Sequence, residues 1–324
     1  TDATVDDDAT VGDDATVGDA TVGSDAAPDA FSGSASWSEF QIFDTRLPID
    51  VWGASADDVW IVGDLGTVLR WNGTAWAPVD QPEAGARLTG VWGHAADHVW
   101  AVGSIESGQN PSMLRWNGTS WGSQVTAVDG SLTSVWGSAA GDAWAVGYPF
   151  NFFGYESAPD EWSPIPGQDV VYVPDGVWAS PDTDDLWIVG NQGISRWRQS
   201  DNAYVESFAT GLHLRAIWGR AGDDVWATGV AGTVMHWDGA AWETTQLDTG
   251  VDFNAVWASA ADDAWAVGSG GAIIHWDGEL WTPLASSPTT IELTGIWGFG
   301  AHDIWAVGHG GYGVILRYAA TEGP

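Results

Sequence analysis

Apolar residues alternate with small or polar ones in short runs along most of this chain, and the runs repeat. The stretch Val51–Trp76, VWGASADDVWIVGDLGTVLRWNGTAW, contains the pattern once, and six further versions follow it at intervals of 39 to 44 residues. Apolar runs of about four to eight residues, bounded by turn residues, predict β-strands. A repeat of about 40 residues built from such strands is typical of the blades of a propeller.

Each repeat divides into four predicted strands. In the second repeat the first two strands are Leu88–Gly93 and Val99–Gly103, and the first repeat shows the third at Thr67–Trp71 and the start of the fourth at Trp76. The second strand ends in Gly in every repeat, which indicates either a positive φ or close packing. Asn-Gly or Asp-Gly separates the third strand from the fourth in four repeats and supplies the positive φ of a tight hairpin turn. These turns are Asn72-Gly73, Asn117-Gly118, Asp238-Gly239 and Asp277-Gly278.

The aromatic residues indicate how many blades there are and how the ring closes. Four aromatic positions in each of seven repeats make 28, and the 25 tryptophans with Tyr155, Tyr204 and Tyr318 fill all of them. The last repeat ends at Tyr318 without a fourth strand, whereas Trp37 precedes the first repeat. We therefore expect Ser34–Phe43 to form the outer strand of the last blade, which removes an unpaired sheet edge. The predicted fold is an all-β, seven-bladed β-propeller of four-stranded antiparallel blades over residues 31–324, closed by this N-terminal strand.

Residues 1–30 differ from the rest of the chain. They hold nine Asp and no basic residue, and the tetrapeptide Asp-Ala-Thr-Val occurs in them four times. An acidic, low-complexity segment of this kind predicts a solvated linker between an anchor and the propeller. Because Ala and Val alternate with Asp and Thr, the segment is also compatible with an extended strand that connects one subunit to the sheet edge of the next.

Two further interpretations of residues 1–30 concern a ligand and a modification. Clustered carboxylates can bind Ca²⁺, although the spacing here departs from that of the EF-hand loop. The candidates are Asp6, Asp7, Asp8, Asp13 and Asp14. Threonines in low-complexity segments can carry O-linked sugars, and the candidates are Thr4, Thr10, Thr16 and Thr21. Apart from this Ca²⁺ candidate, the sequence predicts no cofactor.

Charge and composition narrow the classes of partner. The chain has 44 acidic residues against nine basic ones, all arginine, for a formal charge of −35, and it has no cysteine. Such a charge disfavours nucleic acid and anionic membranes as partners, and a chain without cysteine has no thiol catalysis. No run of 18 apolar residues is present, so the sequence predicts no membrane span. The first residue is Thr1 rather than Met, and we interpret the chain as a processed protein of the extracellular space or cell surface.

Two polar positions recur beside the tryptophans. An acidic residue stands two positions before the second Trp in six repeats, and a basic residue immediately precedes the third aromatic residue in six. The acidic residues are Asp58, Asp142, Asp185, Asp224, Asp263 and Asp303, with His98 in the second repeat. The basic residues are Arg70, Arg115, Arg196, Arg317, His236 and His275. We expect the carboxylates to accept backbone N–H groups at the turn. We expect the basic side chains to lie on Trp faces or to pair with the Asp turns; the alternative is a basic ring that binds an anion in the central channel.

The third repeat departs from the others. Its residues 148–162 read YPFNFFGYESAPDEW, where other repeats have a short turn. We place its aromatic residues on a loop at one rim of the propeller; they are Tyr148, Phe150, Phe152, Phe153 and Tyr155. An aromatic loop can stack on sugar rings or form the centre of a protein interface. The alternative is that the loop folds back and covers the junction between blades 3 and 4.

The recurring pattern resembles that of secreted bacterial β-propeller repeat proteins, the broad group that includes tectonin-like and BNR-like propellers. The resemblance covers residues 34–324 and implies the fold, but propellers host many activities. The sequence lacks the Ser-x-Asp-x-Gly-x-Thr-Trp box of sialidase-type repeats and their clustered arginines, which argues against glycosidase activity by that route. Since no Ser/His/Asp set or phosphate-binding loop stands apart from the repeat either, we expect a protein that is not an enzyme.

These observations favour a structural or interaction protein. In the preferred interpretation the propeller is the subunit of an extracellular fibre or surface assembly, and residues 1–30 connect one copy to the next through a contact that does not close. A glycan-binding, lectin-like propeller is the first alternative, because of the repeated aromatic positions and the aromatic segment of the third repeat. A protein-binding module that a linker attaches to the cell surface is the second.

Overall fold

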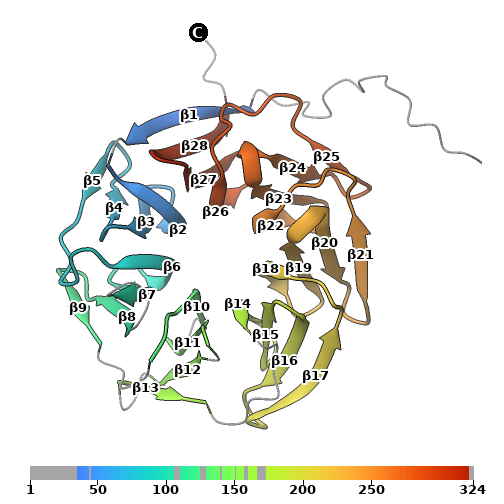
Figure 1. Cartoon of the computed structure of the whole chain (residues 1–324), viewed down its shortest axis with the longest axis horizontal. Coiled ribbons are helices and arrows are strands. Elements are labelled where there is room, and N and C mark those ends of the chain that lie inside the picture. Colours follow the sequence, from blue (N-terminus) through green and yellow to red (C-terminus); the bar gives the residue numbers. More distant parts are fainter. Residues whose placement is uncertain are drawn as a thin grey trace, which may run out of the picture. The chain divides into compact units, whose positions relative to one another are not determined.

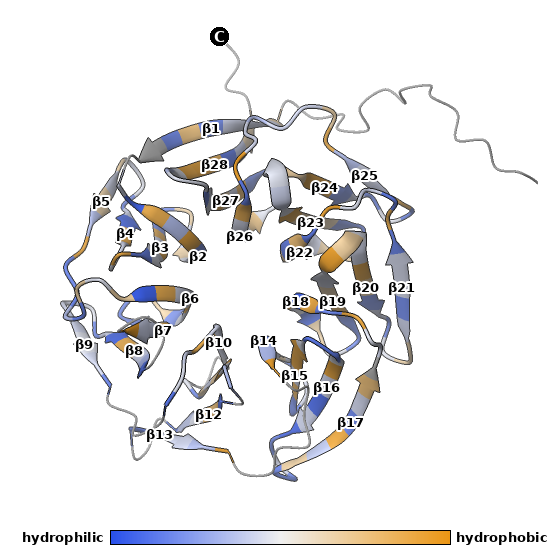
Figure 2. Cartoon of the chain, in the orientation of Figure 1, coloured by the Kyte–Doolittle hydropathy of each residue, from blue (hydrophilic) through white to orange (hydrophobic). Residues whose placement is uncertain are grey.

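Seven four-stranded antiparallel sheets surround a central channel in the computed structural model (Figure 1). The structure describes residues 35–43, 45–105, 110–124, 129–138, 141–149, 151–156, 160–165 and 173–320. The acidic repeats, with the Ca²⁺ and sugar candidates, and Phe150 lie outside the described residues. Apolar and hydrophilic positions interchange along the strands of the ring (Figure 2), as the sequence pattern predicts.

Within each blade the strands are given in order from the innermost, next to the channel, to the outermost. Blade 1 contains β2 (Leu47–Ser55), β3 (Asp58–Asp64), β4 (Val68–Trp71) and β5 (Trp76–Pro78); blade 2 contains β6 (Arg87–Ala95), β7 (His98–Ile105), β8 (Asn110–Trp116) and β9 (Trp121–Ser123); blade 3 contains β10 (Ser134–Gly137), β11 (Ala143–Gly147), β12 (Asn151–Glu156) and β13 (Glu161–Pro164); and blade 4 contains β14 (Pro174–Ala179), β15 (Asp185–Gly190), β16 (Gly193–Arg198) and β17 (Ala203–Ala209). Blade 5 contains β18 (Leu214–Ala221), β19 (Asp224–Gly229), β20 (Thr233–Trp237) and β21 (Trp242–Gln246); blade 6 contains β22 (Phe253–Ala260), β23 (Asp263–Gly268), β24 (Ile273–Trp276) and β25 (Trp281–Pro283); and blade 7 contains β26 (Leu293–Gly300), β27 (Asp303–His309), β28 (Gly313–Ala320) and β1 (Ala35–Phe43). Short 3-10 turns, η2 (Val230–Gly232) and η3 (Ser269–Gly271), follow β19 and β23.

The N-terminal strand closes the ring, as predicted. β1 pairs antiparallel with β28, and Trp37 stands opposite Tyr318. Trp37 is buried, and its ring centroid lies 5.5 Å from that of Tyr318 and 5.6 Å from that of Trp265 in blade 6. The strand thus supplies both the last hydrogen-bonded ladder of blade 7 and an aromatic side chain that packs against blade 6.

Glycine recurs at two positions of the repeat, and a different physical requirement explains it at each. At the hairpin turns Gly73 has φ +86°, and the Asn72 side-chain oxygen accepts the N–H groups of Thr74 and Ala75 at 3.0 Å, which confirms the predicted turn chemistry. The glycine that ends the second strand is required by close packing instead. A Cβ atom on Gly63 would lie 1.9 Å from the carbonyl oxygen of Leu47 on the inner strand.

Four of the seven first-strand tryptophans pack over a glycine of the next blade. A Cβ atom on Gly93 of blade 2 would lie 2.5 Å from Cη2 of Trp52 of blade 1, so the indole lies directly over a backbone that carries no side chain. The same contact joins Gly137 to Trp92, Gly219 to Trp178 and Gly298 to Trp257. All four of these tryptophans are buried.

The other three first-strand tryptophans cannot pack over a glycine of the next blade in this way. Trp136 and Trp218 precede blades that have Ala179 and Ala258 at the glycine position, and the Phe299 ring already occupies the space over Gly53, next to Trp297. These three tryptophans, Trp136, Trp218 and Trp297, are only half-buried and line the central channel. The rings of Trp136 and Trp297 meet at 6.1 Å although they come from blades 3 and 7.

Gly93→Ala is expected to lower the free energy of unfolding by about 1–3 kcal/mol, because the added methyl overlaps the Trp52 indole. Urea denaturation followed by circular dichroism measures the change. Gly122→Ala is the matched control: no atom lies within 4 Å of the position of its added Cβ, so its effect should stay within about 0.5 kcal/mol. Equal losses in the two variants would contradict the role assigned to this contact.

Trp37→Ala is expected to cost about 3–5 kcal/mol, the usual range for deleting a buried Trp, because the side chain packs across the closure of the ring. The denaturation midpoint of the full chain reports this loss. Leu280→Ala, at a side chain that is 53% exposed, should leave the midpoint unchanged. A Trp37 variant as stable as the Leu280 variant would show that β1 does not hold the ring closed.

Candidate functional site

Aromatic side chains from three strands pack at the interfaces between blades. The second Trp of one blade contacts the third and fourth aromatic residues of the next: Trp60 lies 5.0 Å from Trp116 and 5.4 Å from Trp121. Five other interfaces repeat this arrangement with Trp100, Trp187, Trp226, Trp265 and Trp305 at centroid distances of 4.7 to 5.6 Å. The offset and edge-to-face geometries are those that favour aromatic pairs.

A basic side chain covers the second Trp at each of these six interfaces. The Arg70 guanidinium lies 4.7 Å from the Trp60 ring centroid, and its Nε donates to Asp58 at 2.6 Å. The other basic side chains in the same place are Arg115, Arg196, Arg317, His236 and His275. The predicted Trp and Asp contacts of these basic residues are confirmed, and they lie between blades rather than around the channel. The expectation that the carboxylates accept backbone N–H groups is wrong for Asp58 and its equivalents that pair with a cation, because the cations donate to them.

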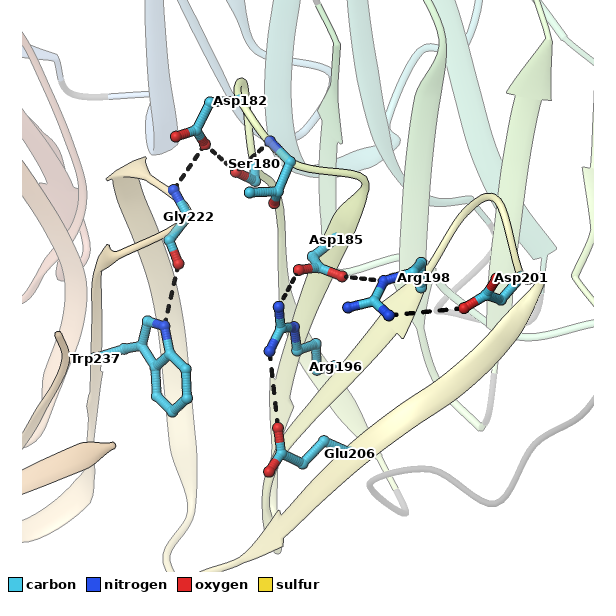
Figure 3. A network of polar contacts seen from close by, with 10 residues as sticks. Ser180, Asp182, Asp185, Arg196, Arg198, Asp201, Glu206, Gly222 and Trp237 are labelled. Carbon is cyan, nitrogen blue, oxygen red and sulfur yellow. Dashed lines mark hydrogen bonds and ion pairs between the residues drawn. The ribbon is translucent and has the colours of Figure 1, made fainter. Parts of the chain in front are cut away.

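In blade 4 the motif is part of an extended polar network (Figure 3). The carboxylate of Asp185, only 4% exposed, accepts hydrogen bonds from Arg196 and from Arg198. Glu206 lies 3.8 Å from Arg196, and Asp201 lies 3.7 Å from Arg198. A buried carboxylate is stable only when it is paired, and here two guanidinium groups surround it.

Blade 2 uses a carboxylate from the next blade. His98 stands at the acidic position, and burial lowers its pKa. Arg115 therefore pairs with Asp160 of blade 3 at 2.5 Å and donates to the Tyr155 hydroxyl. The Tyr155 hydroxyl in turn donates to Asp160, and this bond, together with Arg115, lowers the pKa of Asp160. Burial and the same bond raise the pKa of Tyr155 to about 12.

The interface between blades 3 and 4 is different. Gly154 stands opposite Trp144, where the six other blades have Arg or His. The described rings contain no pair between Trp144 and the third or fourth aromatic residue of blade 4; Trp197 contacts Phe152 instead, at 5.6 Å. The Tyr204 hydroxyl is buried there without a hydrogen-bond partner among the described groups, and burial raises its pKa.

A cavity of about 430 Å³ occupies this position, and we call it the blade 3–4 cavity. Trp144 and Trp197 line it, and Asp142 and Glu156 contribute carboxylates to its wall. Its volume is within the range of about 300–1,000 Å³ that small-ligand sites have. The sequence contains the signal for this site, because Gly154 stands where the other six repeats have Arg or His.

The aromatic segment of blade 3 forms a strand rather than the predicted rim loop. Tyr148 lies in the turn before β12 and is 57% exposed. Phe152, Phe153 and Tyr155 belong to β12 and are buried. Because side chains alternate along a strand, Phe152 faces Trp197 of blade 4, while Phe153 and Tyr155 pack with blade 2. Of the described residues in the segment, Tyr148 alone presents a large aromatic surface to solvent.

The central channel holds a second cavity, of about 140 Å³. Arg215 is the single basic residue among its described lining residues, and it pairs with Asp252 at 2.8 Å. Asp50 also lines the cavity, and its carboxylate accepts the N–H groups of Val51 and Val91 at 2.9 Å. Burial outweighs these two hydrogen bonds and raises the pKa of Asp50 to about 7. The described residues that line this cavity therefore include no ring of basic side chains.

Two further properties of the described part of the chain bear on ligands. No group of three or more His, Asp or Glu side chains within these residues is arranged to hold a metal ion. Within the same residues, no helix has the length and the apolar character needed to cross a bilayer.

Comparison with known proteins identifies the fold. No protein-family model and no curated protein sequence matches the chain. The solved structure of YCF48 bound to D1 peptide is similar at a TM-score of 0.70 and 18% sequence identity, over 89% of this chain and 97% of that chain. YCF48 from Cyanidioschyzon merolae has a TM-score of 0.68 at 18% identity, over 88% and 99%. The WD40 β-propeller domain of Doa1 has a TM-score of 0.68 at 11% identity, over 87% and 97%.

These similarities support the seven-bladed propeller and, at such low identities, they show the fold alone. Proteins of this fold bind ligands at many different places, so the function must be argued from the surface and the cavities of this chain. The narrower resemblance to tectonin-like and BNR-like repeats of secreted bacterial proteins stays a prediction.

Asp50→Asn is expected to change how stability depends on pH. The wild-type carboxyl has a folded pKa of about 7 against 3.8 in the unfolded chain, so the wild type loses stability as pH rises from about 4 to 7. The unfolding free energy of the variant relative to wild type should therefore increase over this interval, by up to roughly 4 kcal/mol. Urea denaturation of both proteins at pH 4.5, 6 and 8 measures the difference. A difference that is constant across the three pH values would contradict the raised pKa.

Proposed function

We propose that this chain is a non-enzymatic interaction propeller that binds a basic segment of a polypeptide partner. The observation that carries the proposal is how the charges are paired. Eight of the nine arginines form ion pairs with the protein's own carboxylates, and they are Arg70, Arg87, Arg115, Arg196, Arg198, Arg215, Arg220 and Arg317. The chain has 44 acidic residues against nine Arg, for a formal charge of −35, and the field of this excess negative charge attracts a basic partner.

The excess negative charge affects both the rate and the selectivity of binding. Complementary charge accelerates diffusional encounter and repels partners of like charge. Anionic surfaces are disfavoured here, whereas Arg-rich and Lys-rich polypeptide segments are attracted. A similar propeller, YCF48, has been solved with a bound peptide, which supports a polypeptide as the class of partner for a ring of this kind.

The narrower functions proposed from the sequence stay predictions. Assembly into an extracellular fibre or surface layer, and attachment to a cell surface, depend on residues 1–30, which lie outside the described residues. Glycan binding depends on the aromatic segment of blade 3. The burial of Phe152, Phe153 and Tyr155 removes most of the described aromatic surface for sugar stacking, and we therefore favour the polypeptide partner.

The proposed function predicts charge-selective and salt-sensitive binding. The full chain should bind peptides with a net charge of about +4 and should fail to bind their charge-reversed counterparts of equal length and hydrophobicity. Raising the salt from 0.1 M to 1 M shortens the Debye length from about 10 Å to about 3 Å, so affinity should fall at least tenfold. Fluorescence anisotropy of labelled peptides measures both effects. Equal binding of the acidic and basic sets, or affinity that salt does not change, would contradict the proposal.

A further inference from the structure

One of the seven blade interfaces lacks the basic side chain that the other six contain. At the six interfaces a guanidinium or imidazole group lies 3.9 to 5.5 Å from the centroid of the second Trp. Five of these basic side chains contact the Asp of their own blade, and Arg115 pairs with Asp160. Blade 3 has both the indole, Trp144, and the acid, Asp142, but Gly154 supplies no side chain between them. The blade 3–4 cavity lies at this position.

Three local features distinguish this interface from the others. A Cβ atom on Gly154 would lie 3.3 Å from Cδ1 of Ile165, so the Ile165 side chain packs beside the glycine, and it also lines the cavity. Phe152 packs against the Trp197 ring from the neighbouring position of the same strand face. In blade 4 a β-bulge at Val205 changes the register of β16 and β17 between Arg196 and Trp197. The regular aromatic packing of the other interfaces is thereby interrupted here.

The wall of the cavity is acidic and unpaired. Asp142 and Glu156 line it, and its described lining residues include no Arg or His. Among the described residues no hydrogen bond or ion pair reaches the Asp142 carboxylate, whereas Asp58 pairs with Arg70 at 2.6 Å. Among the described lining residues, Glu156, Ser163 and Asn202 are exposed, so the cavity adjoins the solvent-exposed surface of the described part of the chain.

We propose that the blade 3–4 cavity binds the arginine side chain of a polypeptide partner, with Asp142 accepting its hydrogen bonds and Trp144 and Trp197 on either side. The inference deepens the proposed function and rests on it. The equivalent positions of the other blades indicate which side chain fits the cavity: four of the six hold Arg, two hold His, and the chain has no lysine. A planar guanidinium stacks on aromatic faces and donates two parallel hydrogen bonds to a carboxylate, which an ammonium group cannot do.

The first test uses a single side chain as the probe. N-acetyl-arginine methylamide should shift the indole N–H signals of Trp144 and Trp197 in ¹⁵N-labelled full-length protein, after assignment with Trp→Phe variants. The citrulline analogue has the same shape and no charge, and it should shift neither signal at equal concentration. Equal shifts from both compounds, or shifts confined to other tryptophans, would overturn the proposal.

Two variants test the site from the side of the protein. Asp142→Asn should lower the association constant of the arginine probe, and of a basic peptide with one Arg, about tenfold, as expected for loss of a charge-assisted hydrogen bond. Asp248→Asn is the matched control, because it removes the same charge from an exposed residue that does not line the cavity; its effect should stay within twofold. Equal effects of the two variants would overturn the proposal.

Gly154→Arg restores the residue class of the other blades and places the protein's own guanidinium in the cavity. Binding of the arginine probe should be lost while the melting temperature is unchanged or raised. If this variant does not fold, the Asp142→Asn comparison still decides the question.

If basic peptides bind wild type, Asp142→Asn and Gly154→Arg equally, the cavity is not the site and the proposed function stands. If the arginine probe occupies the cavity but no basic polypeptide binds wild type, the arginine site is supported and the proposed function fails.

Discussion

The ring depends on how one indole packs at each interface between blades. The second Trp of a blade lies against the third and fourth aromatic residues of the next blade, with a cation on its face and a carboxylate that pairs with the cation. Each part requires the others: the cation is half-buried and needs the carboxylate, and the indole provides the surface on which the cation lies. A chain without cysteine has no covalent closure, so these contacts and the pairing of β1 with β28 hold the ring together.

Much of this arrangement could be predicted because a repeat shows each contact several times. The aromatic positions alone predicted the number of blades and the role of Trp37, since a single missing position had a single candidate to fill it. The contacts of Arg70 and its equivalents followed from the cost of burying an unpaired charge. Prediction failed where one repeat differs from the rest, as at Phe152 and Phe153. An aromatic-rich stretch has the same composition in a loop and in a strand, and only pairing with β11 and β13 decides which faces these side chains cover.

Departures from the repeat have two different physical outcomes in this propeller. Where Ala179 or Ala258 stands in place of the Gly, the Trp of the preceding blade is half-buried and lines the central cavity, and there Trp136 contacts Trp297. That change is compensated inside the protein because the displaced rings find new apolar contacts. Gly154 is different, since the side chain it lacks is a charged one, and the Asp142 carboxylate that remains has no internal partner among the described residues.

An unpaired Asp142 can be tolerated because it is half-buried at an open cavity, where water solvates it at little cost. The same solvation means that charge attraction alone gives a ligand little selectivity, since counterions screen it at physiological salt. Selectivity must come from what water and simple ions lack, namely a planar cation that fits between two indoles and matches a carboxylate. The proposed interaction therefore assigns separate roles to the long-range field of the acidic surface and to the short-range geometry of the cavity: the first raises the encounter rate of basic partners, and the second distinguishes arginine from other cations.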